Sequence, residues 1–354
     1  MQLPSIQSTP SAWYGSEIEC NPEKWVIHMT PIEVDELYTA ATRFLTQGDD
    51  LATINKSNFV LDELGQKLTL LRRELIHGLG FMLVKGIDRS RFTTLQLAAM
   101  FYGLGSHIGN ARMQNNQGHI LGHVRDLSLR SDDSNVRIYQ TNERQTFHTD
   151  STDVVALLCL NKAKSGGESL LVSAVTVFNE MRKNCPELLR CLFDPVSTDR
   201  RGETPAGMEP YFSIPVFTWY KNNLNVIYQR QYIDSAQRFE GAFKLTEAHV
   251  EALNKFDELC NDPGINLRMQ LEPGDIQFVY NHSLLHDRTG FVDFDDLKKR
   301  RHLLRLWLSI PDDRELPAVF KQRFETIDIG SRGGMNLPDV KPCAPLRTSS
   351  GMMV

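Results

Sequence analysis

Residues 140–150 read QTNERQTFHTD, and the expected fold and functional site are organised around this stretch. Read as a β-strand, it places His148 and Asp150 on one side and Thr149 on the other, because side chains alternate along a strand. At roughly 3.3 Å per residue, the imidazole and the carboxylate lie about 7 Å apart and can reach one metal ion from the same direction. A His-x-Asp triplet also arises by chance, as a surface histidine beside a solvated aspartate. The metal interpretation therefore depends on residues 274–307.

The composition is that of an ordinary globular protein. A chain of 354 residues suits one large domain or two modest ones. The net charge of −5 and the scattered basic residues give no electrostatic footprint for nucleic acid or a membrane surface. No apolar run is long enough to span a bilayer, and the N-terminus lacks the pattern of a secretory leader. The cysteines are scattered without a CxxC pair, so we expect a cytoplasmic protein.

Helical signals dominate the first hundred residues. Thr30 and Glu33 form a capping box with Pro31 at the first helical position, which predicts a helix over 30–45. Leucines at helical spacing predict a second helix over 61–77, and 81–84 reads as a short buried strand. A third helix is expected over 94–104, ended by a glycine break at Gly105 and Gly109.

Strand signals dominate the middle of the chain. We expect strands over 154–160, 170–172, 276–280 and 300–308 and a hairpin over 216–228. We also expect a helix capped by Ser173 that extends through Met181 as far as Leu188, and a helix over 246–260. Because no regular βαβ rhythm is present, the pattern favours an α+β fold with antiparallel sheets. The expected organisation is an irregular arm over 1–25, one domain over 26–330 and a loosely ordered tail over 331–354.

The strand expected over 300–308 carries two arginines on one face. Alternation places Arg301, Leu303, Arg305 and Trp307 together, with His302 on the opposite face. Unpaired buried guanidiniums would cost several kcal/mol, about 2–5 or more each, so they need anionic partners. Structural salt bridges are one explanation. The other is a pair of carboxylate clamps about 13 Å apart, which suits two different ligands.

Together these motifs resemble the taurine dioxygenase (TauD/TfdA) family of iron(II)- and 2-oxoglutarate-dependent oxygenases. The resemblance covers about residues 61–307, with the motifs in the family's order. They are His148-Thr149-Asp150, Gly166-Gly167-Glu168-Ser169, Gly274-Asp275, Asn281 with His286, and Arg301 with Arg305. The resemblance implies a double-stranded β-helix (a cupin-like jelly roll) as the core, with flanking helices.

By this resemblance, His148, Asp150 and His286 are the iron ligands. Such a facial triad leaves coordination positions open for 2-oxoglutarate and O2. His282 lies four residues before His286 and competes with it for this role, although the family's ligand follows the Asn281-x-x-x-Leu285 pattern directly. Three further candidates lie in the polar stretch 111–137, where surface or lid roles are the alternative: His119, His123 and Asp126.

The resemblance also assigns ligand-binding residues. Arg301 matches the family's clamp on the far carboxylate of 2-oxoglutarate, and Ser169 stands where the family usually has threonine beside that carboxylate. Arg305 matches the position that holds an acidic group of the primary substrate in several members. Asn142 and Tyr139, on or near the ligand strand, are further candidates for lining the substrate pocket.

The implied reaction oxidises an unactivated C–H bond of a small carboxylate-bearing substrate, for which a free amino acid is the leading candidate. Its outcome is hydroxylation, desaturation or oxidative ring closure such as aziridine formation. The stretch 323–335 is similar to fungal and actinomycete members, some of which act in secondary metabolism. The expected partners are this small anionic substrate and, as a possibility, further copies of the chain, with no nucleic acid or membrane.

Two other classes of function stay open at this point. A metal-dependent hydrolase could use the same triad, but paired arginines suit a dicarboxylate and no additional general base is evident. A catalytically silent binding barrel would predict a broken triad, whereas all three candidate ligands are present.

Overall fold

Two β-sheets form the centre of the structure, a computed structural model that describes residues 2–48, 50–129, 137–205, 207–337 and 339–346. The larger sheet has seven strands in the order β1-β2-β14-β6-β17-β3, with β4 also paired to β17. Only β1 and β2 pair in parallel within it. The bounds are β1 (Val26–His28), β2 (Phe81–Lys85), β3 (Asn110–Ala111), β4 (Leu121–Val124), β6 (Val154–Asn161), β14 (Ile276–Tyr280) and β17 (His302–Ser309).

The smaller sheet has four antiparallel strands in the order β13-β8-β15-β5. Its strands are β5 (Gln145–His148), β8 (Ser169–Ser173), β13 (Leu267–Met269) and β15 (Leu284–Arg288). The described residues form three further two-stranded sheets: β9 (Pro195–Asp199) with β10 (Tyr211–Pro215), β11 (Phe217–Tyr220) with β12 (Asn223–Val226), and β7 (Ser165–Gly166) with β16 (Phe291–Val292). The hairpin expected over 216–228 is thus confirmed as β11 and β12.

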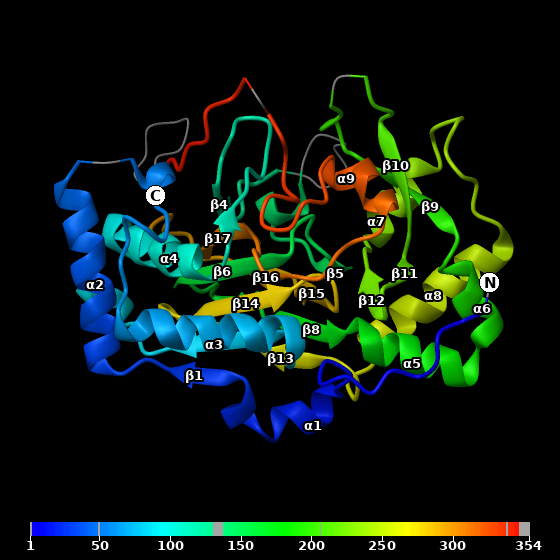
Figure 1. The fold of residues 1–354 in the computed structure, drawn as a ribbon, viewed down its shortest axis with the longest axis horizontal. Helices are drawn as coiled ribbons and strands as arrows, with labels where there is room; N and C mark the ends of the chain where they lie inside the picture. The colour runs from blue at the N-terminus through cyan, green and yellow to red at the C-terminus, as the bar shows by residue number, and fades with distance from the viewer. Residues whose placement is uncertain (1, 49, 130–136, 206, 338, 347–354) are drawn as a thin grey trace.

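Two groups of helices lie on opposite sides of the strands (Figure 1). The first group packs on the larger sheet and comprises α2 (Pro31–Thr46), α3 (Glu63–His77) and α4 (Thr94–Ile108). The second packs on the smaller sheet and comprises α5 (Ala174–Asn184), α6 (Pro186–Cys191) and α8 (Glu247–Asn261). Shorter helices are α1 (Gly15–Glu19), α7 (Arg230–Ala236) and α9 (Lys321–Phe324). Among the described residues, every helix is too short or too polar to traverse a lipid bilayer.

Alternation along β17 decides what faces the space between the two sheets. Leu304 and Leu306 pack with the first helix group, whereas Leu303 and Trp307 pack between the sheets. The face predicted for the two arginines is therefore confirmed as the inner face. Polar side chains on this face lie between two sheets and away from bulk water, and this positions the site.

Two expected helix boundaries were wrong, for identifiable reasons. Helix α4 continues through Gly105 to Ile108. The glycine does not end the helix but allows close packing, since a Cβ there would lie 2.8 Å from a methyl of Leu306. The helix capped by Ser173 stops at Asn184, and Pro186 begins a separate helix. A proline disfavours helical geometry in the residue before it, here Cys185.

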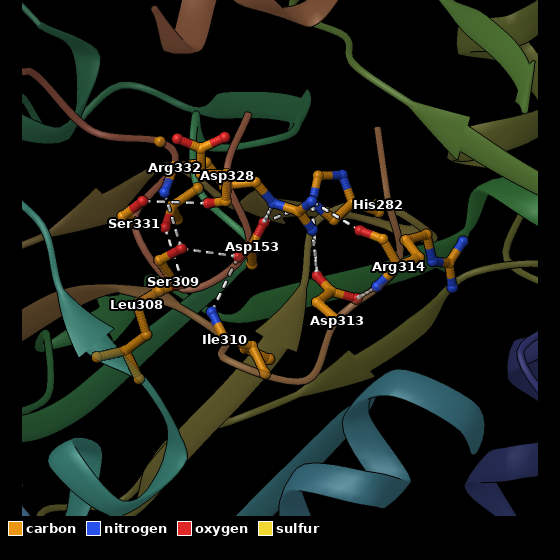
Figure 2. A network of polar contacts seen from close by, with 12 residues as sticks. Asp153, His282, Leu308, Ser309, Ile310, Asp313, Arg314, Asp328, Ser331 and Arg332 are labelled. Atoms are coloured by element: carbon orange, nitrogen blue, oxygen red, sulfur yellow. Dashed lines mark hydrogen bonds and ion pairs between the residues drawn. The ribbon is translucent and has the colours of Figure 1, made fainter. Parts of the chain in front are cut away.

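The C-terminal segment contributes one fully buried charge to the core (Figure 2). Arg332, in the stretch where we expected a loosely ordered tail, is 0% exposed. Its guanidinium donates to Asp153 at 2.7 Å, to Asp313 at 2.6 Å and to the carbonyl of Arg314 at 2.6 Å. Two carboxylates and one carbonyl thus surround a single cation.

Asp153 collects further hydrogen bonds in the same network. His282 lies 2.8 Å from one of its oxygens, and Ser309 and the backbone N–H of Ile310 donate to the other at 3.1 and 2.9 Å. The network therefore joins the start of β6, the turn before β15, the end of β17 and the C-terminal segment.

Replacing Arg332 should destabilise the protein strongly. In Arg332→Met, Asp153 and Asp313 would stay buried without their cation, and removing one partner of a buried ion pair costs about 3–5 kcal/mol. We expect a loss of that size in the free energy of unfolding measured by urea denaturation. The exposed Arg190 provides the control, since Arg190→Met should change stability by less than about 0.5 kcal/mol. A loss below about 1 kcal/mol in Arg332→Met would show that the network contributes little.

Candidate active site

Three side chains of the predicted metal site come together between the sheets. His148 and His286 are direct cross-strand neighbours on β5 and β15, with their ring centroids 4.1 Å apart. Nε2 of His286 lies 3.8 Å from a carboxylate oxygen of Asp150. One ligand atom from each of the three residues lies within 4.8 Å of the others, and all three residues are buried. The structure thus brings the sequence-predicted triad together.

The geometry that brings Asp150 to this point differs from the expected one. Strand β5 ends at His148, so Asp150 lies in the turn that follows and not on the strand. The chain leaves the sheet there because Thr149 donates its backbone N–H to the carbonyl of Tyr228 at 2.9 Å. The backbone N–H of Asp150 then donates to the side-chain oxygen of Asn281 at 2.9 Å. Asn281, singled out in the sequence beside His286, therefore fixes the turn that carries Asp150.

Burial and neighbouring charges set the protonation of the triad. Burial, followed by the adjacent His148, lowers the pKa of His286 to about 3, and burial also lowers the pKa of His148. Burial opposes ionisation of Asp150, but Arg305 and the two imidazoles outweigh it and hold the pKa of this carboxyl below its usual value. The indole N–H of Trp307 also donates to Asp150 at 2.8 Å. At neutral pH the site presents two neutral imidazoles and one carboxylate.

This donor set suits a first-row transition metal. Two imidazoles and a carboxylate with open positions are the ligand pattern of non-haem iron oxygenases. Nδ1 of His148 lies 2.8 Å from the carbonyl of Thr146, so it carries the proton and leaves Nε2 with a lone pair. The side-chain amide of Gln145 lies 2.9 Å from that Nε2. A bound metal would take the place of this amide contact.

A second buried group of two carboxylates and a histidine could also be considered a metal site. It comprises Asp153, His282 and Asp313. However, Arg332 donates to both carboxylates, so a cation of the protein already neutralises them (Figure 2). The structure thus places His282, the alternative ligand, in the ion-pair network and places His286 beside His148 and Asp150.

A cavity of about 490 Å³ adjoins the triad between the sheets. Arg301 and Ser169 line it together with His286, among apolar side chains. Arg301 is 6% exposed, and within the described part of the chain its guanidinium forms no ion pair. Burial lowers its pKa to about 10, so it stays charged at neutral pH. A buried cation of this kind calls for an anionic ligand in the cavity.

Arg288 lies in the same cavity and was overlooked in the sequence. It is 7% exposed, and two of its guanidinium nitrogens have no hydrogen-bond partner among the described residues. Its remaining terminal nitrogen donates to the carbonyl of Glu143 at 2.7 Å. Burial lowers the pKa of Arg288 to about 9, with the nearby Arg301 acting in the same direction. The reasoning applied to the arginines of 300–308, that a buried guanidinium needs an anionic partner, also identifies Arg288, because Arg288 ends a fully buried strand.

A larger cavity of about 780 Å³ opens on the other side of the triad. Arg305 and Tyr139 line both cavities. Arg305 donates to the side-chain oxygen of Gln114 at 2.7 Å and lies 3.6 Å from Asp150. It also lies over the rings of Tyr139 and Trp307, at 4.6 and 4.9 Å from their centroids.

The remaining sequence candidates lie elsewhere. Asn142 is exposed and lines neither cavity. His123 contacts His302 at 2.9 Å and the carbonyl of Pro345 at 2.7 Å, away from the triad. His119 contacts the side chain of Asn115 at 3.1 Å, and Asp126 accepts the backbone N–H of Ser128.

Comparison with known proteins identifies the family that this chain matches and solved structures with a similar fold. The model of the family described as "Taurine catabolism dioxygenase TauD, TfdA family" matches residues 45–307. The chain is 31% identical over 311 residues to the FR-33289 synthase of Streptomyces rubellomurinus, covering 87% of this chain and 91% of that protein. It is 28% identical over 305 residues to the taurine hydroxylase-like protein SAT17 of Stachybotrys chartarum, covering 83% and 77%.

Among solved structures, an asparagine oxygenase with Fe(II), 3-hydroxyasparagine and succinate superposes with a TM-score of 0.63. The match covers 80% of this chain and 93% of that one at 16% identity, so it shows a shared fold. The sheets and helices described above are thus those of a known oxygenase fold.

The neutral state of His302 predicts how stability depends on pH. Burial, followed by His123, lowers the pKa of His302 to about 2. Below pH about 6.5 the unfolded chain takes up a proton that the folded protein excludes, so stability falls with falling pH by up to about 1.4 kcal/mol per unit. Between pH 7.5 and 5.5, His302→Gln should lose about 1 kcal/mol less than the wild type in urea denaturation. His28→Gln, at an exposed position, is the control and should lose as much stability as the wild type over this pH range. Equal losses in wild type and His302→Gln would contradict the burial of a neutral imidazole.

Proposed function

Because the chain belongs to the taurine catabolism dioxygenase TauD, TfdA family, we propose that it is an iron(II)- and 2-oxoglutarate-dependent oxygenase acting on a small anionic substrate. The observation that carries this proposal is the buried triad of His148, Asp150 and His286 beside a cavity containing the unpaired Arg301. On this proposal the two facing sheets form a double-stranded β-helix within one domain over 26–330. None of the three related proteins described above is named as a hydrolase.

In this function His148, Asp150 and His286 hold the iron. Bound iron and 2-oxoglutarate supply, with O2, the oxidative decarboxylation and the oxidant that removes hydrogen from an unactivated C–H bond. The chain keeps both imidazoles neutral through burial and keeps the carboxylate ionised through Arg305 and Trp307. Metal binding then requires no proton release from the histidines near neutral pH.

The smaller cavity takes 2-oxoglutarate. Arg301 clamps its far carboxylate, Ser169 adds a hydroxyl, and Arg288 contributes a second positive charge. Gly167 keeps this arrangement open, since it has a φ of +73° and a Cβ there would lie 2.9 Å from Nε of Arg301. Ser169 at present donates to the side-chain oxygen of Gln277 at 3.0 Å, which orients its hydroxyl beside the arginines.

The larger cavity takes the primary substrate. Arg305 lies where it can bind an acidic group beside the metal, and a free amino acid fits this chemistry, as the asparagine oxygenase with the same fold illustrates. Aromatic walls from Tyr139, Trp307 and Tyr232 limit water around the reacting carbon. Hydroxylation is the default outcome, and desaturation or ring closure such as aziridine formation would follow if the substrate were held away from oxygen transfer. Cytoplasmic location and homo-oligomerisation stay predictions.

Anaerobic titration with Fe(II) and 2-oxoglutarate should give a weak visible charge-transfer band in the wild type. His148→Ala and His286→Ala should lose the band, because each removes a ligand. Arg301→Ala should keep it with about 30-fold weaker 2-oxoglutarate binding, the effect of losing about 2 kcal/mol from a buried charge contact. His28→Ala and Arg190→Ala, both at exposed positions, are the controls. Iron binding without a band in the wild type would exclude the oxygenase and favour a hydrolase.

A panel of free amino acids should contain at least one that raises 2-oxoglutarate consumption several-fold above the rate without substrate. Arg305→Gln should raise the KM for that amino acid, because it removes the cation at the metal-proximal end of the cavity. Succinate formation and O2 uptake measure the rate. If no amino acid in the panel raises turnover, the substrate belongs to another class of small anions.

A further inference from the structure

The larger cavity is also lined by arginines that have no role in the chemistry proposed at the metal. Arg137, Arg200 and Arg323 line this region. They come from separate segments: one precedes the turn 138–140, one follows β9, and one lies on α9. Figure 1 shows α9 beside β10, near α7. Three guanidiniums from distant parts of the chain thus converge on one wall.

In the part of the chain that the structure describes, two of these arginines have no carboxylate partner. Arg137 forms an ion pair with Glu203 and donates to the hydroxyl of Tyr232 at 3.1 Å, so its charge is balanced. Arg200 is 6% exposed, and among the described residues it donates only to the carbonyls of Glu209 and Gln322 and to a methionine sulfur, while its Nη1 has no partner there. Carbonyl groups orient a guanidinium but do not neutralise it.

Arg323 has still fewer partners. Within the described ranges its guanidinium makes neither a hydrogen bond nor an ion pair, and its recorded contact is with the ring of Phe212, 5.9 Å from the centroid. Arg200 lies 5.5 Å from the centroid of the same ring. Burial, together with Arg137 and Arg200, lowers the pKa of Arg323 to about 10 despite the nearby Glu203, so it stays charged at neutral pH.

The acidic groups nearby do not remove this excess of positive charge. Glu203 is paired with Arg137, and Asp199 is bound by Arg238 and Ser235. Glu325 raises the pKa of Arg200 and of Arg323 electrostatically, but it does not line the cavity. Arg200 is buried and Arg323 is half-buried. Like charges held together in such a wall are costly unless an anion lies between them.

We propose that Arg200 and Arg323 bind a phosphoryl or phosphonyl group of the substrate, at the end remote from the metal. This rests on the proposed function, which places the substrate in the larger cavity. A phosphoryl group carries a charge of about −1.5 to −2 and has three acceptor oxygens, which matches two free cations with several unused N–H donors. A carboxylate brings only one charge and two oxygens. The substrate class is therefore a small phosphate ester or phosphonate, and an amino acid carrying such a group combines both anionic ends.

Three amino acids of similar length separate the alternatives: O-phospho-L-serine, L-2-amino-4-phosphonobutanoate and L-glutamate. Isothermal titration calorimetry of the metal-free wild-type protein should show at least about tenfold tighter binding of one or both phosphorus compounds than of glutamate. The first two probes distinguish a phosphate ester from a phosphonate. Because this comparison uses only the wild type, it does not depend on whether a variant folds. Equal or tighter binding of glutamate would overturn the proposal.

Variants of the two arginines then test whether these residues bind the phosphorus compound. Arg200→Gln and Arg323→Gln should each weaken binding of the tighter phosphorus compound by about 10- to 100-fold, since each removes a charge-assisted contact. Arg323→Lys should recover part of the loss, and the exposed Arg190→Gln should change nothing. Unchanged affinity in both cavity variants would show that the anion binds elsewhere.

The iron–2-oxoglutarate titration distinguishes failure of the phosphoryl-binding proposal from failure of the proposed oxygenase function. A normal iron–2-oxoglutarate band without preference for the phosphorus compounds would leave the oxygenase standing and remove this proposal. Preferential binding without the band would leave the anion site standing and remove the oxygenase.

Discussion

The cross-strand pairing of β15 with β5 is the constraint on which the site depends. It sets His286 directly opposite His148, with their rings 4.1 Å apart. Two imidazoles can lie this close in a buried place only while they are uncharged, and burial keeps them so by lowering both pKa values. Packing the two sheets therefore also prepares the lone pairs that a metal needs. The same strand pairing and burial thus determine both the position and the protonation state of the two histidines.

The third ligand is held by a different device. Asp150 lies in a turn whose start is fixed by Asn281 and whose end is fixed by Asp153 in the ion-pair network. Gly333, beside Arg332, packs so closely on this turn that a Cβ there would lie 2.9 Å from the carbonyl oxygen of Ser151. The C-terminal segment thus supports the proposed metal site through the turn that carries Asp150.

Much of this arrangement follows from local sequence rules. Alternation along 301–307 predicted which arginines face inward, and the capping box at Thr30 begins a helix where the sequence predicts one. The departures have long-range causes. After the chain has left the strand, the backbone N–H of Asp150 is held by Asn281, which is 131 residues away in the chain. Arg200 and Arg323 meet at Phe212 only in the folded protein. No periodic pattern within either segment could reveal that meeting, nor the burial of Arg332.

The bond between Arg332 and Asp153 joins residues 179 apart in the sequence. Until residue 332 has left the ribosome, Asp153 and Asp313 lack the guanidinium that neutralises their charges. The turn that carries Asp150 then lacks this support. A nascent chain can therefore form both sheets and place both histidines before its carboxylate ligand is secured. Long-range contacts of this kind are formed late, because the closure of a long loop must precede them. If Asp150 is the metal ligand proposed above, a protease product that ends before residue 332 would keep both sheets but would lack the cation that supports the turn carrying this ligand.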